Sequence, residues 1–104
     1  MSIRLEQVGP GQSRLVGALS FETVPEFWRQ FDAAGLFEGG GDAALQVDLS
    51  GVTRADSAGI ALLLALMREA RGAGRQLVFA GLPDQLARMI EVSDLESVIP
   101  RQIA

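Results

Sequence analysis

The sequence contains no cysteine, no histidine and no lysine. Without cysteine the chain has no disulfide, no thiolate metal site and no thiol nucleophile. Without histidine it lacks the commonest general base and metal ligand. Because lysine is also missing, a serine nucleophile would find only arginine as its basic partner, and arginine does not deprotonate in proteins. These absences favour a protein that is not an enzyme.

Excess positive charge is also missing, since 13 acidic residues outnumber 9 arginines and the net charge is −4. Nucleic-acid binding needs a basic surface, so we expect no nucleic-acid partner. A chain of 104 residues predicts one domain over residues 1–104. The first residues, Met1–Glu6, do not resemble a signal peptide, and the apolar run Gly59–Met67 is too short to span a bilayer. We therefore expect a cytoplasmic protein with no direct membrane insertion.

Common phosphate and metal motifs are not present. The glycines Gly39–Gly41 lack the following Lys-Ser/Thr of a phosphate loop, and Gly72–Gly74 follows an expected helix instead of preceding one. Asp42, Asp48 and Asp56 have no histidine and no further acid to complete a metal site. We therefore expect linkers at the glycines, no metal and no cofactor.

Hydrophobic periodicity predicts four strands and three helices. Alternating apolar residues indicate a hairpin followed by two further strands, while apolar residues at helical spacing indicate the helices. The first helix is expected to begin with a capping box formed by Thr23 and Glu26, with Pro25 in its first turn, and to end at Gly35. The expected strands are Ile3–Val8, Ser13–Leu19, Ala44–Leu49 and Gln76–Ala80, and the later helices are Ser57–Arg71 and one opening at Asp84.

This β-β-α-β-α-β-α order predicts an α/β domain with a mixed sheet. The hairpin supplies an antiparallel edge, and the strand–helix–strand crossovers imply parallel pairing of the later strands. We expect the helices to pack mainly on one face. The strand Gln76–Ala80 is apolar on both faces, which favours a central place in the sheet. Whether the tail Leu95–Pro100 adds a fifth strand is left open, so the sheet has four to five strands.

The segment from Leu45 to Ile60 carries most of the functional information. An alternating strand runs into a polar loop, which brings Asp56 and Ser57 to the start of a long apolar helix. Backbone N–H groups at a helix start favour oxygen ligands and negative charge. Ser57 could therefore cap this helix, accept a phosphate or contact a partner.

Two large apolar residues have alternative interpretations. Helical rotation places Leu62 away from the expected core face of Ile60, Leu63 and Met67, so it is either an isolated surface leucine or part of an apolar strip that faces a partner. Trp28 on the first helix is either a core residue or an interface anchor.

The strand Leu45–Leu49, its loop, and the sequence Asp56-Ser57-Ala58-Gly59 before an apolar helix resemble the STAS family. This family includes anti-sigma factor antagonists and the cytoplasmic tails of sulfate transporters. The segments Leu19–Pro25 and Ser57–Leu64 are most similar to small stand-alone members that serve a phospholipid-asymmetry ABC transport system. The family's regulatory hydroxyl corresponds to Ser57. Anti-sigma factor antagonists often have a second serine where this chain has Ala58, which favours the transporter subclass.

The resemblance implies a STAS fold and a non-enzymatic cytoplasmic subunit. This subunit would bind the ATPase of an ABC transporter, in a complex with the permease at the inner membrane, and support phospholipid movement between the bacterial membranes. The alternative is an anti-sigma factor antagonist whose Ser57 is phosphorylated by an anti-sigma factor kinase, and a third hypothesis is a nucleotide- or lipid-binding module. The expected partner contacts are Thr53, Arg54, Asp56, Ser57, Ala58, Gly59 and Leu62.

Overall fold

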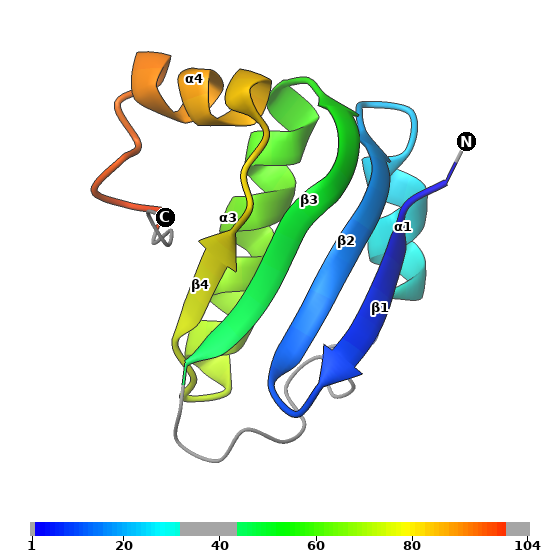
Figure 1. Cartoon of the computed structure of the whole chain (residues 1–104), viewed down its shortest axis with the longest axis vertical. Coiled ribbons are helices and arrows are strands. Elements are labelled where there is room, and N and C mark those ends of the chain that lie inside the picture. The colour runs from blue at the N-terminus through cyan, green and yellow to red at the C-terminus, as the bar shows by residue number, and fades with distance from the viewer. Residues whose placement is uncertain (1, 32–43, 100–104) are drawn as a thin grey trace.

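The computed structural model describes residues 2–31 and 44–99 of the chain. This part contains four strands and three helices in the expected order (Figure 1). The strands are β1 (Arg4–Gly9), β2 (Gln12–Leu19), β3 (Leu45–Ala55) and β4 (Leu77–Ala80). The helices are α1 (Val24–Gln30), α3 (Ser57–Gly72) and α4 (Asp84–Val92).

The four strands form one mixed sheet in the order β1-β2-β3-β4. β1 and β2 are an antiparallel hairpin, whereas β3 pairs in parallel with both β2 and β4. Helices α1 and α3 lie behind the sheet in Figure 1, and α4 lies across the end where β3 meets α3. The mixed sheet with helices mainly on one face is therefore confirmed.

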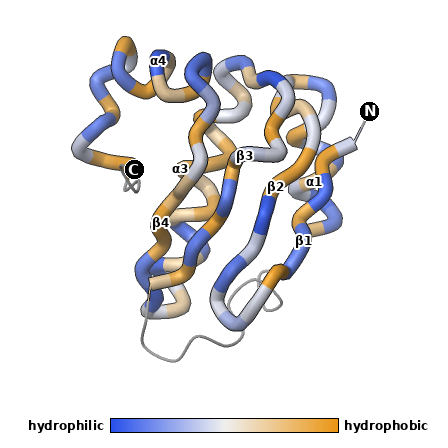
Figure 2. Tube along the Cα trace, viewed as in Figure 1, coloured by the Kyte–Doolittle hydropathy of each residue, from blue (hydrophilic) through white to orange (hydrophobic). Residues whose placement is uncertain are grey.

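The core lies between the sheet and this helical layer. Strand residues alternate between apolar and polar along β3, as Figure 2 shows, because side chains of a strand point alternately to its two faces. Leu45, Val47 and Leu49 are fully buried against the helices, while Gln46 and Ser50 are exposed on the other face. One face of the sheet thus forms the core, and the other carries polar side chains.

Strand β3 is longer than predicted. Residues Ser50–Ala55, expected to be a polar loop, continue the strand because β2 runs beside them as far as the pair Leu19 and Ala55. The register with β2 shifts between Arg14 and Val16 and again between Gly17 and Ala18, so β3 accommodates extra residues. β3 therefore reaches the start of α3 with only Asp56 between them.

The prediction that β4 lies in the centre of the sheet is wrong. β4 pairs only with β3 in the described part of the chain, so it is an edge strand of that sheet. Its Leu77 and Phe79 are buried, and Val78 and Ala80 on the other face are half-buried. Apolar residues on both faces of a strand indicate that both faces are buried. They do not indicate whether the strand has a hydrogen-bonded neighbour on each side. Residues Leu95–Ile99 are turns and form no fifth strand, although Ile99 is fully buried.

The prediction of a capping box at α1 is also wrong, although Thr23 is the N-cap and a proline lies in the first turn. The Thr23 hydroxyl donates to the Ala18 carbonyl at 2.6 Å and accepts from the Ser20 N–H at 2.9 Å, so it is not available to cap the helix. Glu26 pairs instead with Arg29, and its other carboxylate oxygen accepts from the Gln30 amide at 2.9 Å. The helix ends at Gln30, and the predicted end at Gly35 and linker at Gly39–Gly41 lie outside the described residues.

Candidate functional site

The candidate site is the junction between β3 and α3, where Asp56 caps the helix. Its Oδ1 accepts from the Ala58 N–H at 2.8 Å, which satisfies a backbone donor of the first turn. Its Oδ2 accepts from the Phe21 N–H at 3.1 Å, and the Asp56 N–H donates to the Leu19 carbonyl at 3.0 Å. Asp56 therefore joins the start of α3 to the end of β2 and to the loop that follows it.

Ser57 is the first residue of α3 and is exposed. Of the three roles considered for Ser57, that of helix cap is wrong, because the carboxylate of Asp56 occupies it. Both residue types are good N-caps, and the additional hydrogen bond to Phe21 favours aspartate at this position. The Ser57 hydroxyl is consequently left at the surface, at the positive end of a 16-residue helix.

Gly59 allows the first turn of α3 to pack closely on the sheet. A Cβ atom at this position would lie 3.1 Å from the Leu19 Cβ and 3.2 Å from the Ala55 Cβ, closer than ordinary van der Waals contact. The small residue therefore fixes how near the helix start lies to the ends of β2 and β3. This packing places Ser57 relative to the strand residues Thr53 and Arg54.

The predicted contact residues divide into exposed and buried groups. Thr53, Arg54 and Ser57 are exposed, and Asp56 is partly exposed. The prediction that Leu62 faces outward is wrong, because it is 1% exposed and belongs to the hydrophobic core. The buried face of α3 lies about one residue further round the helix than predicted and includes Leu66. The remaining predicted contacts, Ala58 and Gly59, are also buried.

Sequence reasoning missed two exposed apolar residues, Phe21 and Val92, and a groove beside Ser57. Phe21, whose N–H binds Asp56, is 68% exposed, and Val92 at the end of α4 is 88% exposed. A groove of about 550 Å³ runs between α3 and α4, and its lining includes Ser57, Met89 and Val92. The groove also has the charged residues Asp84 and Arg88 in its lining, so it offers a partner both apolar and charged contacts. Only the fold reveals this groove, because its residues are far apart in the sequence.

The polar face of the sheet carries a charged pair beside the register shift. Arg14 Nε donates to Asp48 Oδ2 at 3.3 Å, and Asp48 also accepts from the Ser50 N–H at 2.9 Å and from its hydroxyl at 3.0 Å. Partial burial alone would raise the pKa of the Asp48 carboxyl, but the Ser50 groups and Arg14 together lower it below its usual value. Asp48 thus stabilises the irregular part of β3 and is not a candidate proton donor near neutral pH.

Two further findings apply to residues 2–31 and 44–99. No group of three acidic, histidine or cysteine side chains lies close enough to hold a metal ion. None of the helices in these ranges combines the length and the apolar character that crossing a membrane requires.

The fold is similar to solved structures of one class. A candidate anti-sigma factor antagonist from Thermotoga maritima matches with a TM-score of 0.70 and 13% identity, over 98% of this chain and 86% of that chain. The anti-sigma factor antagonist SpoIIAA in its unphosphorylated form matches with a TM-score of 0.63 and 19% identity, over 98% and 88%. The murine anion transporter Slc26a9 matches with a TM-score of 0.61 and 24% identity, over 88% of this chain and 15% of that chain. These similarities show that this chain shares its fold with those proteins.

The family described as "Mlab, STAS domain" matches residues 7–100. The chain therefore belongs to this family. A search of curated protein sequences finds no match.

Proposed function

We propose that this chain is a non-enzymatic subunit that binds and supports the ATPase of an ABC transporter. The transporter would move phospholipids between the inner and outer bacterial membranes and maintain their lipid asymmetry. In this proposal the chain is cytoplasmic and reaches the inner membrane only through its complex with the ATPase and the permease. The membership of the MlaB STAS family supports this choice over other uses of the fold.

The observation that carries the proposal is the exposed hydroxyl of Ser57 in a groove that Val92 also lines. Because Asp56 caps α3, the Ser57 side chain is available to a partner without loss of the helix cap. Val92 provides exposed apolar area in the same groove, and the exposed Phe21 belongs to the loop whose N–H binds Asp56. A polar group beside exposed apolar area is typical of a protein interface, where apolar area gives affinity and hydrogen bonds give specificity. We place the ATPase contact here, with Thr53 and Arg54 at its margin.

Co-purification with the transporter ATPase tests this placement. We expect Ser57→Arg to reduce binding by at least about tenfold, because a buried, unpaired charge at an interface costs more than about 1.4 kcal/mol. Ala73→Arg is the matched control, since it adds the same exposed side chain at the other end of α3, about 24 Å away. Wild-type binding by a folded Ser57→Arg protein would show that the ATPase contact lies elsewhere.

The second candidate function is an anti-sigma factor antagonist controlled by phosphorylation. The exposed position of Ser57 favours it, because a kinase could reach the hydroxyl without unfolding the helix start. A phosphate there would lie at the favourable end of the helix dipole but beside Asp56, and it would repel a partner matched to the neutral serine. Intact mass after incubation with an anti-sigma factor kinase and ATP distinguishes the two. A single phosphoryl group that is absent from Ser57→Ala would support this function, and an unchanged mass would count against it.

A further inference from the structure

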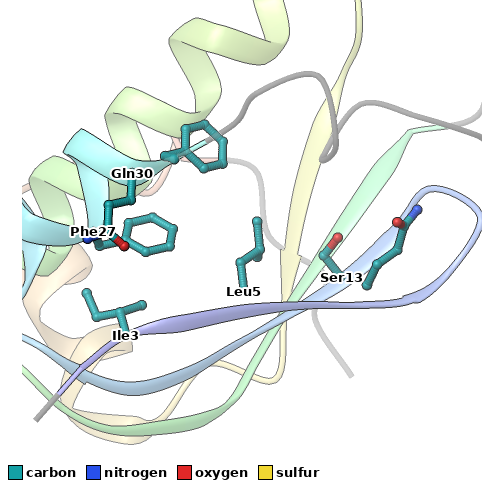
Figure 3. Close-up of a pocket in the computed structure, with 7 residues that line it drawn as sticks. Ile3, Leu5, Ser13, Phe27 and Gln30 are labelled. Atoms are coloured by element: carbon teal, nitrogen blue, oxygen red, sulfur yellow. The ribbon is translucent and has the colours of Figure 1, made fainter.

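A cavity of about 340 Å³ lies between the hairpin and α1, away from Ser57 (Figure 3). In Figure 3 the side chains of Ile3, Leu5 and Ser13 point from the strands toward the helix that carries Phe27 and Gln30. The volume falls within the range of about 300–1,000 Å³ that is typical of small-molecule sites. The lining is apolar at Ile3, Leu5, Phe27 and Phe31 and polar at Gln7, Ser13 and Gln30.

Ser13 is the unusual residue of this cavity. It is 4% exposed, yet its hydroxyl forms no hydrogen bond with another residue in the described part of the chain. Buried hydroxyl groups normally have a partner, because an unpaired one loses its bonds to water. Every fully enclosed side-chain polar atom of the described residues has a hydrogen-bond partner. Because the Ser13 hydroxyl has none, it is not fully enclosed, and we take it to be accessible from the cavity that Ser13 lines. It can donate one hydrogen bond and accept others from a molecule bound there.

The polar and apolar parts of the lining are separated along the hairpin. Gln7 lies directly opposite Ser13 in the antiparallel register, so two uncharged polar groups lie together at one end. Leu5 and Ile3 continue along β1 toward the other end, where Figure 3 shows the ring of Phe27 and the polar side chain of Gln30 on α1. None of the seven described lining residues is charged. A charged ligand group placed against the buried Ser13 hydroxyl would lose part of its water and find no counter-charge among these seven residues, whereas an uncharged hydroxyl or ester group loses less on burial and can hydrogen-bond to Ser13.

We propose that this cavity binds a neutral single-chain amphiphile. Its apolar chain would lie between β1 and α1, and its uncharged hydroxyl or ester group would bind Ser13 and Gln7. The proposal does not depend on the ATPase contact, because none of the lining residues belongs to the surface around Ser57.

The single tryptophan of the chain gives a direct binding assay. Trp28 stacks on Phe31, a wall of the cavity, with ring centroids 5.2 Å apart and an interplanar angle of 21°. Monolauroylglycerol, titrated below its micelle concentration, is expected to change the Trp28 emission saturably and to raise the unfolding temperature. Glycerol, which has no chain, is expected to have no effect, and the laurate anion is expected to bind at least about tenfold more weakly. No saturable change with monolauroylglycerol, or equal binding of laurate, would overturn the proposal.

Variants locate the binding site. Ser13→Ala removes one hydrogen bond and is expected to weaken binding about three- to tenfold. Leu5→Phe places a bulkier ring in the path of the apolar chain between β1 and α1 and is expected to weaken binding. Val8→Phe is the control, because Val8 is half-exposed on the opposite face of the same strand and its replacement should leave binding unchanged. Undiminished binding by both Ser13→Ala and a folded Leu5→Phe protein would contradict the assignment.

Discussion

The role of Asp56 as the cap of α3 makes a prediction that separates it from its neighbour Ser57. Asp56→Ala removes the acceptor for the Ala58 N–H, and loss of an N-cap costs about 1 kcal/mol. It also leaves the Phe21 N–H without its carboxylate, which adds about 1 kcal/mol. We therefore expect the free energy of unfolding to fall by about 2 kcal/mol. Ser57→Ala, which removes only an exposed hydroxyl, is expected to change it by less than about 0.5 kcal/mol.

Urea unfolding followed by the fluorescence of Trp28 measures these changes, with circular dichroism as an independent probe of the helices. A loss of about 2 kcal/mol corresponds to a fall of about 10 °C in the unfolding temperature of a domain of this size. Asp56→Asn keeps an oxygen acceptor and should lose less stability than Asp56→Ala, because only the charge–dipole attraction is removed. A larger loss for Ser57→Ala than for Asp56→Ala would refute the assignment of the cap.

Three further substitutions test the packing and electrostatics around the site. Gly59→Val forces side-chain atoms into the narrow space at the end of β2, so we expect a loss of about 1–3 kcal/mol in urea unfolding despite the removal of a helical glycine. Thr23→Val leaves the Ala18 carbonyl without its 2.6 Å donor, and we expect calorimetry to show a loss of about 1–3 kcal/mol. The folded-state pKa of Asp48 is lowered, so the ionised carboxylate stabilises the fold. This contribution to the free energy of unfolding is present above about pH 4 and is lost as the pH falls through the lowered pKa. Asp48→Asn should therefore be less stable than wild type at pH 7, by less than about 1 kcal/mol for this partly exposed pair, and the difference should shrink at pH 3.

The order of elements could be predicted from the sequence because each has a clear hydrophobic period. The end of β3 could not be predicted, since Ser50 and Gly51 are typical of loops and become part of a strand only because β2 lies beside them. Intrinsic strand propensity is weak, and pairing with a neighbouring strand readily overrides it.

The sequence predicted the strand–helix junction that carries Asp56 and Ser57, but not the hydrogen bonds made there. Asp56 and Ser57 are adjacent residues with similar capping tendencies, and the contact that distinguishes them comes from Phe21, 35 residues earlier. Leu62 was assigned to the wrong side because the helix buries a wide face, which includes Leu63 and Leu66. Helical periodicity identifies the buried side of a helix accurately when the apolar stripe is narrow. It is less accurate when apolar residues cover a wide face.

The separation of the helix cap from the exposed hydroxyl has a consequence for how such a domain changes partners. Because the fold does not use the side chain of residue 57, most residues could be placed there without a large effect on stability. Recognition could therefore diverge by single substitutions at this position while the fold remains intact. A library varied only at residue 57 should yield folded proteins throughout, which makes this position suitable for engineering new binding specificity on an unchanged scaffold.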